Sequence, residues 1–392
     1  MHALYLAWQY LVFNRLRTLT LIACVTLIAA LPLSLEVLLA ESERQLLSRA
    51  ESTPLLVGAK GSALDLVMNA LYFDDELPEL VSMRAVDELW DSELADPVPL
   101  YSRFQARGFP IVGTTLDYFD FRGLELAAGR QIALLGEAVL GASVAEELGL
   151  GPGDTLLSSP QTVFDLAGVY PLKMNIVGVL ERAHTPDDLA VFVDIKTAWV
   201  IEGIGHGHQD VSQVTDGTLI MQRSESGVVA SPKLFQYNEI TPDNIDSFHF
   251  HGDSGQYPVA AVIAIPNDVK SSTLLRGRYL ERESTRQIIV PAKVIDGLLQ
   301  NIFRIKNVLD AVIVIVGAAT LLALLLVFAL SLRLRQRELQ TIFKLGCSRA
   351  TTVYLLGAEI LIIGLVAGAL CLAAVLVVDT QSSDIVRALF IN

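Results

Sequence analysis

The stretch that decides the fold is Arg333-Leu-Arg-Gln-Arg-Glu-Leu-Gln-Thr-Ile-Phe-Lys-Leu-Gly-Cys-Ser-Arg349, which separates two long apolar segments. Residues 333–352 contain five Lys or Arg and one Glu, so five minus one gives a net charge of +4. Short loops rich in Lys and Arg stay on the cytoplasmic side of a membrane. The stretch is therefore predicted to be a cytoplasmic loop that joins two membrane spans.

Three segments are predicted to cross the membrane: residues 18–40, 309–332 and 353–378. Each carries one charged residue, in order Glu36, Asp310 and Glu359. Each is long enough for a hydrocarbon core of about 30 Å at about 1.5 Å per residue. A cleaved signal peptide is the alternative for the first segment. Its long apolar run and the lack of a clear Ala-x-Ala site after it favour a retained anchor.

Charge orients these spans. Residues 1–17 carry Arg15 and Arg17 and no acid, which predicts a cytoplasmic N-terminus. Residues 41–305 then lie outside, as a periplasmic or extracellular domain of a multi-pass inner-membrane protein. This segment holds 20 Lys and Arg against 37 Asp and Glu. It offers no basic stripe for phosphates, which argues against a nucleic-acid partner.

The N-terminal segment, residues 1–17, is interpreted as an interfacial helix in contact with membrane lipid. Tyr5, Trp8 and Tyr10 suit the headgroup level. A plain extension of the first span is the alternative.

The outer segment is predicted to be an α+β domain. Short apolar runs bounded by turn residues predict strands at residues 54–58, 109–113, 138–141, 174–180, 190–194 and 259–265. Helices are expected at residues 143–148 and 195–202, and stalk helices at 38–50 and 291–306. Residues 203–256 are predicted to be a loop-rich insertion. The segment has no cysteine, so a packed core rather than disulfides must stabilise it. The fold class is thus an α-helical membrane domain with a large α+β domain inserted between spans 1 and 2.

The second half of the basic loop predicts a compact helical knob. Leu339, Ile342 and Phe343 fall on a short helix that Gly346 ends, and Ser348 can cap the next helix. Exposed apolar residues on a cytoplasmic helix suit the groove of a soluble partner. The alternative is that the arginines serve only as positive-inside anchors.

Two features of the third span have open interpretations. Glu359 is costly in a membrane unless it reaches the interface or a partner, so it either braces the loop or takes part in coupling. Gly364 and Gly368 form a small-xxx-small pattern that permits close helix contact. That contact is either within one protomer, which we favour, or in a homodimer.

The order of these features resembles that of the FtsX/MacB-type permeases of ABC transporters. The resemblance rests on Asn14-Arg-Leu-Arg17, Gly129-Arg130, Gly136-Glu-Ala-Val-Leu-Gly-Ala-Ser-Val-Ala145, Leu148-Gly-Leu-Gly-Pro-Gly-Asp154, Arg337-Glu338, Lys344-Leu-Gly346, Ser348-Arg349 and Glu359. The family pattern has four spans, whereas three are predicted here. The fourth is expected to be either truncated or lacking, with residues 379–392 as an extracytoplasmic tail.

The resemblance implies a MacB-like periplasmic core and a permease homodimer whose loop docks on a separate ABC ATPase. The docking residues it implies are Arg337, Glu338, Leu339, Ile342, Phe343, Lys344, Gly346, Ser348 and Arg349. The chain has no Gly-x-x-x-x-Gly-Lys-Ser/Thr motif. ATP and Mg²⁺ are therefore expected on the partner ATPase, with no cofactor and no catalysis in this chain. The expected function is export or extraction of a substrate, with a periplasmic or outer-membrane partner as a further candidate.

Four histidines form two tight pairs, His206-Gly-His208 and His249-Phe-His251, in the loop-rich insertion. Four imidazoles suit Zn²⁺ or Cu²⁺. The alternative is that loops of an acidic domain simply tolerate histidine. Two rival functions follow from these interpretations: an FtsX-like regulator that transmits ATPase motion to a cell-envelope enzyme, and a metal-binding membrane receptor.

Overall fold

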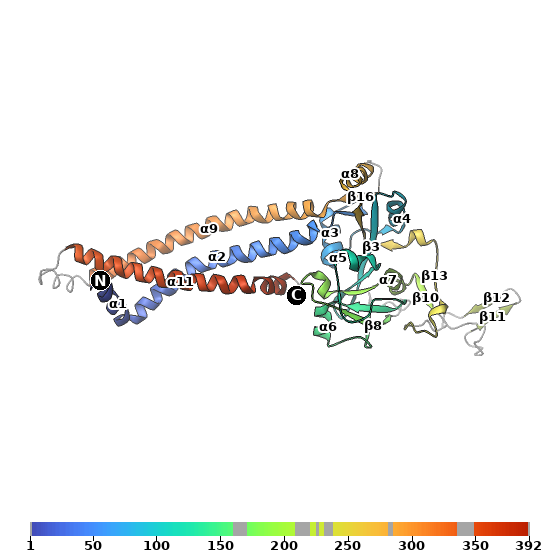
Figure 1. The fold of residues 1–392 in the computed structure, drawn as a ribbon, viewed down its shortest axis with the longest axis horizontal. Coiled ribbons are helices and arrows are strands. Elements are labelled where there is room, and N and C mark those ends of the chain that lie inside the picture. Colours follow the sequence, from blue (N-terminus) through green and yellow to red (C-terminus); the bar gives the residue numbers. More distant parts are fainter. Residues whose placement is uncertain are drawn as a thin grey trace. The chain divides into compact units, whose positions relative to one another are not determined.

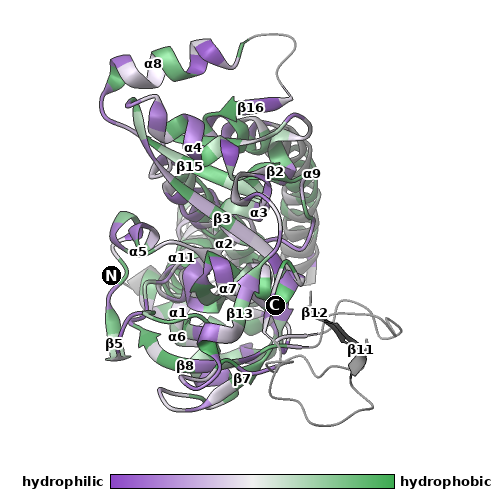
Figure 2. Ribbon diagram, turned by 90° about the vertical axis from the view of Figure 1, so that its right-hand side faces the viewer, coloured by the Kyte–Doolittle hydropathy of each residue, from purple (hydrophilic) through white to green (hydrophobic). Residues whose placement is uncertain are grey.

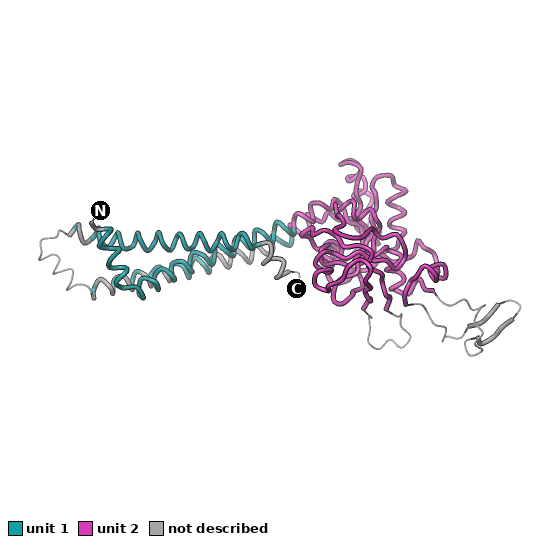
Figure 3. Tube along the Cα trace, turned by 60° about the horizontal axis from the view of Figure 1, so that its bottom comes forward, with its two compact units in different colours: residues 1–46, 297–392 teal, residues 47–296 magenta. Residues whose placement is uncertain are grey.

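The computed structural model describes residues 2–159, 171–207, 220–224, 227–230, 238–280, 285–334 and 349–390. The chain divides into two units, coloured separately in Figure 3. Unit 1 comprises Met1–Leu46 and Gly297–Asn392, and unit 2 comprises Leu47–Asp296.

Unit 1 is built from long helices (Figure 1). They are α1 (His2–Phe13), α2 (Arg15–Glu51), α9 (Pro291–Leu334) and α11 (Arg349–Phe390), of which α2 ends and α9 begins in unit 2. Within the described residues, two helices are long and apolar enough to cross a membrane: Arg15–Glu51 and, inside α11, Val353–Ser382. The segment 309–332 is helical within α9, and its role as a third span stays a prediction.

Helix α11 buries one stripe within unit 1. The stripe consists of Glu359, Ile363, Ala367 and Cys371, at the four-residue spacing of one helix face. Helix α1 packs against α11, and Thr26 of α2 donates a hydrogen bond to the Ala367 carbonyl at 3.4 Å. The opposite face of α11 is exposed.

Unit 2 has an α+β fold, as predicted. Its main sheet follows the order β16-β1-β15-β3-β4-β9-β6-β8-β5, with β7 beside β8. The strands are β1 (Leu55–Ala59), β3 (Ala95–Ala106), β4 (Phe109–Thr114), β5 (Leu126–Gly129), β6 (Glu137–Leu140), β7 (Thr155–Leu157), β8 (Lys173–Leu180), β9 (Val191–Asp194), β15 (Ala261–Pro266) and β16 (Arg286–Ile289). The pairs β4–β9 and β6–β8 are parallel, and the other pairs are antiparallel.

Most of the strand predictions are confirmed to within a residue or two. The exception is the run 259–265, which the structure divides between β14 (Pro258–Val259) and β15. Strand β14 turns away to pair with β2 (Val81–Ser82). The predicted helices are confirmed as α6 (Ala142–Leu148) and α7 (Ile195–Glu202), and α9 begins with a proline, where the missing N–H costs nothing.

Both faces of the sheet are covered. In β9, Val191 and Val193 point into the main hydrophobic cluster, whereas Phe192 points to the other face. There its ring meets those of Phe73 and Tyr118, with centroids 6.3 and 5.6 Å away. The strands β1 and β6 are buried along their whole length, which explains the continuous apolar runs at residues 55–59 and 138–140.

Besides α6 and α7, four helices in the described part of unit 2 surround this sheet: α3 (Ala63–Tyr72), α4 (Arg84–Asp91), α5 (Asp117–Arg122) and α8 (Val269–Arg278). Figure 2 shows polar and apolar residues mixed along α8. The predicted loop-rich insertion holds two short antiparallel ribbons, β10 (Gly205–Gly207) with β13 (Phe248–Phe250) and β11 (Ile220–Ser224) with β12 (Gly227–Ala230).

Candidate functional site

The predicted ATPase-docking loop falls mostly outside the described residues. Helix α9 ends at Leu334 and α11 begins at Arg349, while 335–348 are not described. The docking residues from Arg337 to Ser348 therefore remain predictions. Arg349 is the first residue of α11.

The residues singled out in the third span lie on different faces of α11. Glu359 is 2% exposed and belongs to the buried stripe. Gly364 and Gly368 are exposed, and a Cβ built on either would meet no described heavy atom within 4 Å.

The junction between α2 and the core of unit 2 contains a buried ion pair. Arg49, in the last turn of α2, donates to both carboxylate oxygens of Asp187, at 2.5 and 2.8 Å. Its Nε donates to the Leu71 carbonyl of α3 at 2.5 Å, and its Nη2 donates to the Tyr118 hydroxyl of α5 at 2.9 Å. The Tyr118 hydroxyl in turn donates to Asp187 at 2.6 Å. One guanidinium therefore ties α2 to three separate parts of the core.

The charges in this cluster stabilise one another. Burial opposes ionisation of Asp187, but the Arg49 charge and hydrogen bonds from Arg49, Tyr118 and Thr185 lower the pKa of its carboxyl overall. Burial likewise acts to lower the pKa of Arg49, but the charge interactions with Asp187 and Tyr118 and the hydrogen bonds to both together raise this pKa overall. Burial and the nearby Arg49 charge lower the pKa of Arg122. Arg49 and Asp187 are thus held as an ion pair inside the protein.

The end of α2 is closed by the residues that follow it. The hydroxyls of Ser52 and Thr53 both donate to the Arg49 carbonyl, at 2.9 and 3.0 Å. The same hydroxyl oxygens accept from Arg122, at 3.1 and 2.9 Å. These bonds satisfy a carbonyl that a helix end would otherwise leave open.

Sequence reasoning missed this junction and predicted only a stalk helix over residues 38–50. Its partner Asp187 is 138 residues away in sequence, so no local spacing relates the two. The only local signal was an arginine at the end of an amphipathic stalk, three residues before the Ser52-Thr-Pro54 turn.

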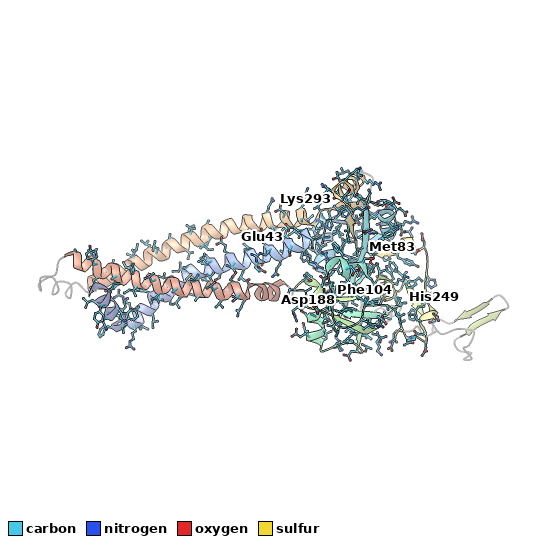
Figure 4. All side chains as sticks on the ribbon, in the orientation of Figure 1. Glu43, Met83, Phe104, Asp188, His249 and Lys293 are labelled. Carbon is cyan, nitrogen blue, oxygen red and sulfur yellow. The ribbon has the colours of Figure 1, made fainter. Side chains whose placement is uncertain are left out.

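The motif residues near 130–137 have structural roles. Arg130 pairs with Glu137, and the Glu137 carboxylate also accepts from the backbone N–H groups of Ala133 and Leu134, at 2.8 and 3.0 Å. Gly129 has a φ of +80°, and a Cβ there would lie 2.9 Å from the Gly178 Cα. These residues close the turn between β5 and β6. Asp188, labelled in Figure 4, closes the turn at residues 183–188 in the same way. Its carboxylate accepts hydrogen bonds from the backbone N–H groups of Ala183 and His184, at 2.8 and 2.7 Å.

Three of the four predicted metal ligands come together on one ribbon. His206 of β10, His249 of β13 (labelled in Figure 4) and His251 place one donor atom each within 4.8 Å of one another. Their ring centroids are 4.8–4.9 Å apart. His208 lies outside the described residues.

A comparison with protein families decides what kind of protein this is. The model of the MacB-like periplasmic core domain matches residues 22–233, which is more than half of the chain. The chain belongs to this family. The match confirms the resemblance to MacB/FtsX-type ABC transporter permeases, and the α+β core of unit 2 is a MacB-like periplasmic domain.

Similar solved structures include domains of three transporter or permease proteins. The periplasmic region of MacB from Actinobacillus actinomycetemcomitans has 13% identity and a TM-score of 0.34, over 64% of this chain and 93% of that one. The extracellular domain of the noncanonic ABC-type transporter YknZ from Gram-positive bacteria has 12% identity and a TM-score of 0.32, over 60% and 98%. A domain of a putative permease from Porphyromonas gingivalis has 13% identity and a TM-score of 0.27, over 60% and 85%. No curated protein matches the MacB-like chain.

Proposed function

We propose that the chain is the permease subunit of an ABC transporter, which couples a separate cytoplasmic ATPase to movement of its periplasmic domain. The movement serves export or extraction of a substrate. One observation carries the proposal: in a MacB-like core, both stalk helices join neighbouring strands at the same end. Helix α2 leads into β1, and β16 leads into α9. Leu56, near the start of β1, pairs with Ile289 at the end of β16.

This connection suits the transmission of force. The β1–β16 pair is antiparallel over four residue pairs, so a pull on either helix is shared by backbone hydrogen bonds of the sheet. At the end of α2, Arg49 adds a buried ion pair and bonds to α3 and α5. At the start of α9, Ile295 is fully buried. A helix fixed in this way transmits displacement to the core instead of bending at its attachment.

The mechanism follows from these attachments. ATP-driven closure of the ATPase dimer would move the loop 336–349, and α2 and α9 would carry the motion to the MacB-like core. A substrate outside the membrane is then moved or released. Two permease chains and two ATPase chains make up the proposed assembly.

The test alters the loop by charge reversal or by a proline substitution, and ATP hydrolysis is measured in vesicles that contain the chain and its co-purified ATPase. The variants Arg337→Glu, Lys344→Glu and Gly346→Pro are expected to abolish stimulation of ATP hydrolysis by the permease while the chain still inserts and folds. Lys293→Glu is the control, because this exposed lysine lies at the start of α9. Loop variants that keep wild-type stimulation would contradict the coupling role.

A further inference from the structure

The ribbon of β10 and β13 presents its histidines on a single face. His206 lies directly opposite His249 in the antiparallel register. The His251 N–H donates to the Ile204 carbonyl at 3.2 Å, which continues the ladder by one more step. Since His249 and His251 are two residues apart on an extended chain, both point to the side that His206 occupies.

The other face of the ribbon is fixed by phenylalanines packed over glycines. Phe250 covers Gly205, where a Cβ would come within 2.5 Å of its ring, and Phe248 covers Gly207, where a Cβ would come within 2.6 Å. Both rings pack against the main hydrophobic cluster of unit 2. The glycine–phenylalanine pairs therefore hold the ribbon against the core and turn the three imidazoles outward.

The separation of the donor atoms suits a metal ion after a small adjustment. One nitrogen from each ring lies within 4.8 Å of the others. Three nitrogens at Zn–N distances of about 2.0–2.1 Å in a tetrahedral arrangement are about 3.4 Å apart. Side-chain rotations alone can close the difference, because His206 and His249 are only half-buried and His251 is exposed.

The orientation of His249 is also that of a metal ligand. Its Nδ1 lies 3.0 Å from the Ser247 carbonyl oxygen. A carbonyl oxygen can only accept, so Nδ1 carries the proton and the lone pair is on Nε2. Histidine ligands commonly donate their second ring nitrogen to a backbone carbonyl, which fixes the tautomer and the ring.

Among the described residues, no carboxylate enters the cluster. Within the described residues, the group that could hold a metal consists of the three histidines alone. Asp253, two residues beyond His251, forms an ion pair with Arg84 at 3.1 Å. An all-imidazole donor set favours a borderline transition metal such as Zn²⁺ over Mg²⁺ or Ca²⁺.

We propose that His206, His249 and His251 bind one Zn²⁺ ion on the outer face of the β10–β13 ribbon. Three protein ligands leave one coordination position for water or for a donor atom of a binding partner. The ion links two strands that are separated by about forty residues of the insertion, and so holds the insertion on the core. This site goes beyond the transport role and does not depend on it.

The experiment titrates Zn²⁺ into the full-length chain in detergent, purified through an affinity tag that contains no histidine. A chromophoric chelator in competition reports the free ion. One ion per chain is expected. His206→Gln and His249→Gln each remove a direct ligand of the ion. Loss of an outer-shell partner alone costs about 10–100-fold in metal affinity, so each variant is expected to lose at least that much. The matched control is His184→Asn, which changes a histidine outside the cluster whose φ of +60° asparagine tolerates.

A rescue separates metal binding from folding of the ribbon. His251→Cys keeps a ligand at an exposed position and is expected to retain Zn²⁺, whereas His251→Gln is expected to lose affinity. Cu²⁺ serves as a second probe and should bind more tightly at the same nitrogens and weaken with the same variants. The proposal is overturned by a wild-type chain that binds no stoichiometric Zn²⁺, by His249→Gln at wild-type affinity, or by equal loss in His184→Asn and His249→Gln.

Discussion

At the scale of residues, Arg49 is a charged group that joins the end of α2 to several parts of the core of unit 2. It is buried at the end of a helix, and its charge is neutralised by Asp187. Removing one member of a buried pair leaves the other as an uncompensated charge, which costs more than the pair itself contributes. The junction of α2 with the core therefore depends on both residues.

Arg49→Met is expected to lower the free energy of unfolding by about 3–5 kcal/mol, because Asp187 stays buried without its partner. The measurement is thermal or denaturant unfolding of the full chain in detergent, followed by tryptophan fluorescence. Arg44→Met is the matched control. Its side chain is 75% exposed and pairs with Glu41 on the helix surface, so its loss should cost less than about 1 kcal/mol. Equal effects of the two substitutions would contradict the role of the buried pair.

The same pair predicts how stability depends on pH. The folded pKa of Asp187 is lowered relative to the unfolded chain, so the unfolded state binds more protons as the pH falls. The stabilisation is complete above the unfolded pKa of about 3.9 and is lost as the pH falls through the folded pKa. Unfolding measured from neutral pH downward should show this loss in the wild type. In Asp187→Asn the loss in that range should be smaller.

At the scale of elements, close backbone approach fixes how α6 meets the turn that carries Asp187. Gly141 precedes α6 and donates its N–H to the Ala190 carbonyl at 2.9 Å. A Cβ on Gly141 would come within 2.5 Å of the carbonyl carbon and oxygen of Asp188. These are backbone atoms, which cannot move aside as a flexible side chain can.

Gly141→Ala is therefore expected to destabilise the chain by about 1–3 kcal/mol, the usual cost of inserting a methyl group into a packed site. Gly151→Ala is the control, since a Cβ there would meet nothing described within 4 Å. Denaturant unfolding curves of both variants give the comparison. A Gly141→Ala chain as stable as Gly151→Ala would show that the turn can shift away from α6.

The exposed glycines of α11 lead to a prediction about assembly. Gly364 and Gly368 offer an exposed small-xxx-small surface beside the buried stripe, because each follows a buried stripe residue by one position, about 100° around the helix. The double variant Gly364→Leu/Gly368→Leu should shift the proposed homodimer toward monomer, as seen by native mass spectrometry in detergent. Ala373→Leu, at another exposed small residue of α11 that lies about 140–180° around the helix from the two glycines, should leave the distribution unchanged. A double variant that stays dimeric would remove this surface from the interface.

At the scale of the whole molecule, the charge distribution predicts its orientation in the membrane. The basic loop contains Cys347, whereas residues 41–305 contain no cysteine. A membrane-impermeant maleimide should therefore label Cys347 only from the cytoplasmic side. In a Glu147→Cys/Cys347→Ser chain, the exposed position 147 of unit 2 should be labelled only from the other side. Labelling of both positions from one side would contradict the predicted topology.

The amino-acid sequence by itself determined the elements whose signal is local. The apolar run of α2, the strand runs of the α+β core and the bounds of α7 follow from residue patterns within one element. The histidine cluster could be predicted from the sequence only in part. The two members of each pair are close in sequence, but no local pattern places His206 opposite His249.

Only the tertiary structure decided the contacts between distant segments. It joined Arg49 to Asp187, turned the phenylalanines of β13 inward so that its histidines face outward, and placed the starts of β1 and α9 at neighbouring strand ends. The physical reason is that these contacts depend on strand pairing and burial across long sequence separations. A pattern within one segment carries no information about them.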